Sequence, residues 1–217
     1  MSPSSPPPAA IVQLRNLITY NLSNDLLQNA LFLAGRLHGL DPRSPETIYL
    51  LAQCHLKLGH FRAAYDYARD ARVQRFTSSS PNSSLATAQL GCAYVFAQAC
   101  LALRRYGEGI NALERCRVLW QGRNHWMSGA VCAEKRGPDA PAVCCLLGKL
   151  CRANGEEKKG AEWFAESLRG NPFMWDAFCE LSDGGAWAYL CQEAWQRGWR
   201  RLTSMQVCLF ARITSSK

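Results

Sequence analysis

Apolar residues recur along most of the chain at a spacing of three to four, and sustained alternation of apolar and polar positions is nearly absent. This spacing is typical of amphipathic helices and leaves few candidate strands. Four segments also share a small-residue landmark within the apolar face, at Ile18, Ala52, Ala97 and Gly148. The landmarks are 34, 45 and 51 residues apart, so one 34-residue period is complete and two are extended. The pattern predicts an all-α chain of recurring helix pairs.

A period of 34 residues is that of the tetratricopeptide repeat (TPR), a helix-turn-helix unit that stacks into an α-solenoid. We therefore expect a TPR-like helical domain over residues 11–182, with about four repeats and irregular insertions between them. The repeats are predicted near residues 11–42, 45–76, 90–120 and 141–172.

The extra residues fall at the junctions between repeats. Thr77–Ser84 is a loop by composition, and Gln121–Pro141 holds glycines and prolines that forbid a long uninterrupted helix. Residues 1–10 are expected to be a disordered tail. Residues 183–217 lack repeat landmarks, and we expect a divergent tail that is either helical or the product of a truncated or mis-joined gene model.

The landmarks have a simple packing role. Two helices approach closely only where small residues face each other, so Gly148 and Gly160 permit a contact that leucine would block. Large residues such as Leu51, Phe61 and Phe96 are expected to fill the remaining core volume. We expect these positions to determine how the helices pack and to take no part in catalysis or ligand binding.

The chain has 217 residues, of which 48% are hydrophobic and 19% are charged. The segment Leu85–Leu103 has 19 residues without a charge and is long enough to span a bilayer, but a buried helix of a helical array gives the same signal. Because the repeat frame places this run at a first-helix position, we expect a core helix and no membrane partner.

Eleven cysteines occur without a repeating spacing and without any CxxC motif. A disulfide framework is therefore not expected, and reduced, buried thiols are favoured. Zinc is the alternative, because five potential ligands lie in one stretch, although adjacent cysteines suit tetrahedral ligation poorly. They are His125, Cys132, Cys144, Cys145 and Cys151. We expect no cofactor and no metal.

Several motifs resemble a narrower family than the general TPR. ALFLAGRL, YLLAQCHLKLGHFRAAY, YVFAQACLALRRYGEGINAL and above all LLGKLCRANGEEKKGAEWFAESLRGNPFMWDAF are similar to the N-terminal TPR region of the anaphase-promoting complex (cyclosome) subunit 3, the BimA-type subunit. The resemblance covers Ile11–Leu181. It implies a non-catalytic scaffold of a multi-subunit ubiquitin ligase in the nucleus, and also the cytoplasm, that acts in mitosis and cell division. Its implied partners are a second copy of itself, as a homodimer, and other ligase subunits.

The repeat frame also predicts a groove for protein partners. In three repeats, first-helix positions that face the inside of the solenoid form an apolar and aromatic ridge, which suits an apolar helix laid into a groove. The predicted groove residues are Leu22, Tyr49, Leu56, Tyr94 and Leu101. The resemblance implies self-association, and we expect the first helix of a second copy to enter the groove. Its predicted dimerisation residues are Leu14, Leu17, Ile18 and Leu22.

Three other functions stay open. A TPR adaptor or co-chaperone would bind a different protein partner, and a Cys/His enzyme could use one of the four histidines, although no catalytic motif accompanies them. The stretch Trp187–Arg201 could bind a membrane surface or nucleic acid, but its apolar residues do not segregate on one face, so we expect neither partner. Ser44 and Ser80 each precede proline and are possible phosphorylation sites.

Overall fold

The structure is a computed structural model and describes residues 8–73, 84–124 and 137–183. These residues form helices and turns, and no strand occurs among them. The predicted all-α TPR solenoid is confirmed. The helices are α1 (Pro8–Ser23), α2 (Leu27–Leu40), α3 (Pro45–Lys57), α4 (Phe61–Val73), α5 (Ser84–Ala102), α6 (Tyr106–Arg115), α7 (Arg117–Trp120), α8 (Ala140–Ala153), α9 (Glu157–Gly170) and α10 (Trp175–Asp183).

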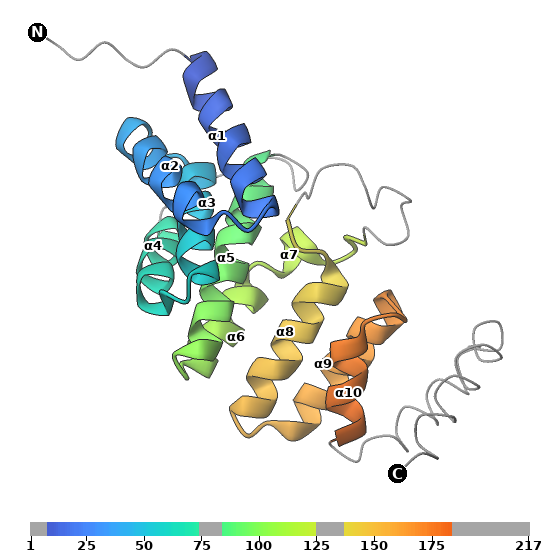
Figure 1. Cartoon of the computed structure of the whole chain (residues 1–217). Coiled ribbons are helices and arrows are strands. Elements are labelled where there is room, and N and C mark those ends of the chain that lie inside the picture. The colour runs from blue at the N-terminus through green and yellow to red at the C-terminus, as the bar shows by residue number, and fades with distance from the viewer. Residues whose placement is uncertain (1–7, 74–83, 125–136, 184–217) are drawn as a thin grey trace, which may run out of the picture.

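Four helix pairs form the solenoid, namely α1/α2, α3/α4, α5/α6 and α8/α9 (Figure 1). The pairs follow one another in space in the order in which they follow one another in sequence. The central helix α5 contacts α3 and α4 on one side and α6 and α8 on the other. Since each pair contacts mainly its neighbours, the chain has several small core clusters along its length.

The turn inside each pair has the same structure in all four repeats. Each pair is joined by three residues, and the middle residue has a positive φ: Asp25 (55°), Gly59 (78°), Arg104 (59°) and Gly155 (84°). The next amide donates a hydrogen bond to the carbonyl five residues earlier, as His60 N does to His55 O at 2.9 Å. This bond closes the first helix as in a Schellman motif, and only glycine adopts the left-handed conformation without cost.

The small landmarks lie where the repeat pattern places them. Ile18, Ala52 and Ala97 are each 0% exposed, and Gly148 is buried. A Cβ at Gly148 would lie 2.5 Å from the ring of Phe164, and a Cβ at Gly160 would lie 3.2 Å from the carbonyl oxygen of Gly148. The close approach of α8 and α9 therefore depends on the absence of side chains at both positions.

Replacing Gly148 with alanine should lower the free energy of unfolding by about 1–3 kcal/mol, because Phe164 must leave its packed position. Urea unfolding followed by far-UV circular dichroism measures the change. Gly35→Ala is the matched control: it also lies within a helix, but no heavy atom lies within 4 Å of the added Cβ. The control should gain up to about 1 kcal/mol. Equal stability of the two variants would contradict the packing argument.

Helix α5 contains the uncharged run, and by length and composition it could cross a membrane. In this fold most of its residues are buried against neighbouring helices. The helix begins at Ser84, earlier than residue 90, where the third repeat is expected to start. The predicted core-helix role of this run is consistent with its position.

Two helices have no counterpart among the predicted pairs. The short helix α7 follows α6, and its Trp120 is buried and donates a hydrogen bond from Nε1 to the carbonyl of Leu113 at 2.9 Å. Helix α10 packs on α8 and α9 through Ala177 and Leu181.

Helix α8 begins where Asp139 accepts a hydrogen bond from the amide of Ala142 at 3.2 Å, with Pro141 in its first turn.

Candidate partner groove

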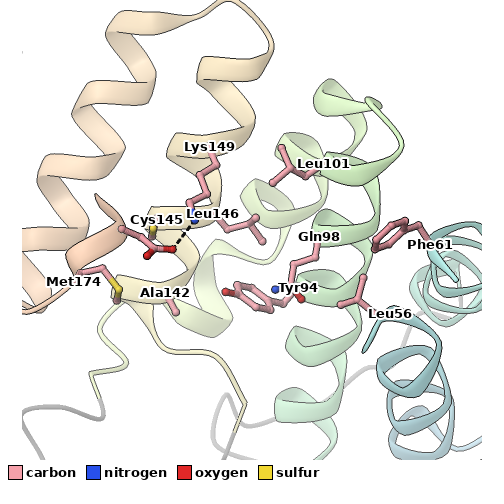
Figure 2. Close-up of a pocket in the computed structure, with 11 residues that line it drawn as sticks. Leu56, Phe61, Tyr94, Gln98, Leu101, Ala142, Cys145, Leu146, Lys149 and Met174 are labelled. Atoms are coloured by element: carbon pink, nitrogen blue, oxygen red, sulfur yellow. Dashed lines mark hydrogen bonds and ion pairs between the residues drawn. The ribbon is translucent and has the colours of Figure 1, made fainter. Parts of the chain in front are cut away.

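A cavity of about 420 Å³ opens on the inner face of the solenoid, between the first helices of successive pairs (Figure 2). Helix α5 contributes three residues between Tyr94 and Leu101, and α8 contributes four between Ala142 and Lys149. Their spacing along each helix places them on one face of it. The loop before α10 and the start of α4 close the ends. The lining residues are Leu56, Phe61, Tyr94, Gln98, Leu101, Ala142, Cys145, Leu146, Lys149, Met174 and Asp176.

The walls of this groove are largely apolar, and its charged groups are paired with each other. Lys149 Nζ donates a hydrogen bond to Asp176 Oδ2 at 2.7 Å. Burial lowers the pKa of Lys149, but the hydrogen bond to Asp176 and nearby negative groups outweigh it and raise the pKa above its ordinary value. One turn further along α8, Arg152 pairs with Glu180 at 2.6 Å. These two ion pairs join α8 to α10 and leave the groove without a large net charge.

Burial dominates the chemistry of the titratable groups inside the groove. Burial, with smaller contributions from the neighbouring Cys145 and Asp139, raises the pKa of Tyr94 to about 12. Burial also raises the pKa of Cys145 to about 11, while Lys149 acts in the opposite direction. Both groups are therefore neutral at physiological pH. The groove offers apolar surface with polar edges, which suits a protein segment.

Three of the predicted groove residues line this cavity, namely Leu56, Tyr94 and Leu101. Tyr49 lies outside the lining, because its ring packs against Gly91, where a Cβ would lie 2.6 Å from the ring. Burial raises the pKa of Tyr49 to about 12. Leu22 is 7% exposed and belongs to the core cluster that α1, α2 and α3 share. The groove therefore begins at α3 and does not extend to α1.

Several lining residues were missed by sequence reasoning. Cys145 stands three residues before Gly148, as Tyr94 stands three before Ala97, so the repeat register could have identified it. The prediction that Phe61 fills the core is wrong: it is 39% exposed and lies at the edge of the groove. Met174 and Asp176 come from the segment after the fourth repeat, and no repeat position marks them.

The predicted dimerisation residues lie on two sides of α1. Ile18 is 0% exposed and Leu22 is 7% exposed, so both are committed to the core of the same chain. Leu14 is half-buried against that core, whereas Leu17 is 41% exposed. The outward face of the helix also carries Val12 and Tyr20, which are more than half exposed.

Of the two predicted phosphorylation sites, Ser44 lies within the described residues. Ser44 immediately precedes α3, and its Oγ accepts a hydrogen bond from Nη2 of Arg15 at 3.1 Å. Arg15 also forms ion pairs with Glu46 and Asp41. Ser80 lies outside the described residues. Phosphorylation at either serine stays a prediction.

Most cysteines in the described part of the chain are buried, and burial raises the pKa of several of their thiols. The pKa rises to about 12 at Cys54, Cys92 and Cys144, and to about 11 at Cys151. Among the described residues, no group of three or more His, Cys, Asp and Glu side chains could hold a metal ion. His125 and Cys132, which belong to the zinc alternative, lie outside that part of the chain.

Solved structures with related folds support the architecture. MamA has a TM-score of 0.57 with 16% identity, over 86% of each chain. A Podosopora anserina putative kinesin light chain, whose own TPR-like repeats are nearly identical to one another, has a TM-score of 0.60 with 16% identity. The match covers 97% of this chain and 98% of that one. Similarity at this level of identity establishes the fold alone.

Sequence comparisons are more specific. Residues 23–116 match the family described as anaphase-promoting complex, cyclosome, subunit 3. Protein bimA of Emericella nidulans is 49% identical over 173 residues, which are 80% of this chain. The chain carries a TPR region of the subunit 3 type. Anaphase-promoting complex subunit 3 of Schizosaccharomyces pombe is 31% identical over 78% of the chain.

The human cell division cycle protein 27 homolog is 29% identical over 82% of this chain. The chain spans about a fifth of the length of these subunit 3-type relatives: 20% of the Emericella protein, 23% of the Schizosaccharomyces protein and 19% of the human protein. The similarity therefore covers most of this chain and a minor part of each relative.

Proposed function

We propose that this chain acts as a non-catalytic scaffold within an anaphase-promoting complex ubiquitin ligase, in cell-cycle progression and ubiquitin-dependent proteolysis. The 49% identity to protein bimA over 80% of the chain carries this proposal. The subunit 3 family match and the TPR fold agree with it. The proposed location is the nucleus, and also the cytoplasm, and the similarity to cell-cycle proteins supports it.

The proposed partners are other ligase subunits and a second copy of the same chain. The groove supports protein binding, since its walls are apolar and its charged groups are internally paired. If α1 of a second copy supplies the contact, it must use Val12, Leu17 and Tyr20, because Ile18 and Leu22 are already buried. Contact through these three exposed residues would keep α1 as the dimerisation helix and leave the packing of the first repeat unchanged.

Affinity purification of the tagged chain from mitotic cells tests the scaffold proposal. We expect subunits of a cullin-type ubiquitin ligase to be enriched over a tagged control. Recovery of heat-shock proteins without ligase subunits would instead favour the co-chaperone alternative and contradict the proposal. Light scattering of the purified chain tests self-association separately, since a dimer has twice the 24.2 kDa mass of one chain.

A further inference from the structure

Two histidines contact one tyrosine on the side of the solenoid formed by α2, α3 and α4, and a third histidine lies against one of them. The ring of His55, on α3, stacks on Tyr67, on α4, with ring centroids 5.4 Å apart and an interplanar angle of 9°. His38, on α2, meets the same tyrosine edge-on at 5.8 Å. His60 lies in the turn between α3 and α4, and its side chain is exposed. The stacking against Tyr67 limits the orientations that the His55 ring can take.

His55 and His60 point the same type of ring nitrogen at each other. Their Nδ1 atoms are 3.4 Å apart. A typical N–H hydrogen bond is shorter, about 2.7–3.2 Å, so this contact is a weak hydrogen bond. The turn that brings the two rings together is fixed by the hydrogen bond from His60 N to His55 O and by the positive φ of Gly59. The backbone therefore places the two residues so that their Nδ1 atoms can approach each other.

The same separation fits neighbouring ligands of a tetrahedral metal ion. Zinc–imidazole bonds are about 2.0–2.1 Å long, and the edge of a tetrahedron is about 1.63 times the centre-to-vertex distance. Two imidazole nitrogens on one zinc ion are then about 3.3–3.4 Å apart. Magnesium and calcium prefer oxygen ligands, so a pair of imidazoles selects a zinc-like transition metal instead.

We propose that His55 and His60 bind one zinc-like divalent transition-metal ion through their Nδ1 atoms, with water at the remaining positions. Within the described residues no cluster of three protein ligands exists, so the site is open and its affinity is moderate. The ion would join the end of α3 to the turn before α4. The two histidines are next to the groove residues Leu56 and Phe61 in the chain, but neither lines the groove cavity, so zinc binding can be measured independently of the scaffold proposal.

Zinc titration of the purified full chain tests this site, with a chromogenic chelator as competitor. The chain has 11 cysteines, so zinc bound elsewhere is subtracted by comparing variants. We expect His60→Gln to lose one zinc equivalent, or to bind it at least about tenfold more weakly, because removing one of two ligands leaves a single imidazole. His60 is exposed, so this variant should keep its fold.

His38→Gln is the matched control, because it changes a histidine that contacts the same tyrosine as His55 but takes no part in the Nδ1 contact. It should keep the zinc equivalent. Zinc should also raise the melting temperature of the wild type and of His38→Gln, but not of His60→Gln, since binding to the native state stabilises it. Unchanged zinc affinity and stoichiometry in His60→Gln, or no zinc binding by the wild type, would overturn the proposal.

Discussion

Replacing Phe96 with alanine should lower the free energy of unfolding by about 3–5 kcal/mol, the range expected when a buried phenylalanine is removed. Phe96 is 1% exposed and lies on the central helix α5. Its ring stacks on Tyr65 at a centroid distance of 4.8 Å, in a cluster with alanines of α3 and α4. Those alanines are too small to fill the space, so the variant leaves a cavity between two repeats.

Urea unfolding followed by circular dichroism measures this loss. Phe32→Ala is the matched control, because Phe32 is 61% exposed on α2 and contacts Arg36 through a cation–π interaction at 5.3 Å. The control should change the free energy of unfolding by less than about 1 kcal/mol. Similar losses in both variants would mean that α5 does not pack as the central helix.

The repeat register could be predicted from the sequence because close packing of helices leaves a periodic trace. Ile18, Ala52 and Ala97 are fully buried, and the ring of Phe164 packs against Gly148. The repeat pattern in the sequence indicates burial at all four positions. The residue type at such a position is determined only by contacts within one repeat and with the adjacent repeat. Such local constraints recur every time the unit recurs, so one chain contains several independent copies of the same signal.

The turns inside the helix pairs recur in the structure more regularly than their residue types recur in the sequence. Gly59 and Gly155 mark two of the four left-handed turn residues, but Asp25 and Arg104 occupy the same position in the other repeats. A non-glycine residue in this conformation costs about 1–2 kcal/mol, which the closing hydrogen bond and helix packing outweigh. Sequence reasoning identifies a glycine at such a turn readily, whereas arginine gives no indication of it.

The groove was harder to predict than the core. Tyr94 and Leu101 belong to one helix face, so their spacing reveals them. Phe61, Met174 and Asp176 reach the same cavity from other elements, and their positions depend on how successive pairs are arranged in space. Leu22 occupies an equivalent first-helix position but is buried by α2 and α3. Equivalent positions in a repeat therefore do not have equivalent exposure at the end of a solenoid.

Replacing Phe61 with aspartate should weaken self-association through the groove by at least about tenfold. Phe61 is 39% exposed at the edge of the cavity, next to Leu56 and Leu101, and the substitution places a charge on the apolar surface that a partner must cover. Phe61 is also the first residue of α4, where a negative charge is favourable to the helix. The variant should therefore keep its fold while losing its partner.

Sedimentation equilibrium at several micromolar concentrations measures the dissociation constant, and circular dichroism checks the fold. Val118→Asp is the matched control, because Val118 is 80% exposed on α7 and does not line the cavity. It introduces the same charge on the same molecule and should leave the dissociation constant unchanged. If both aspartate variants dimerise like the wild type, the groove is not the self-association surface. If both dissociate, net charge, not the groove, controls assembly, because each variant adds one negative charge.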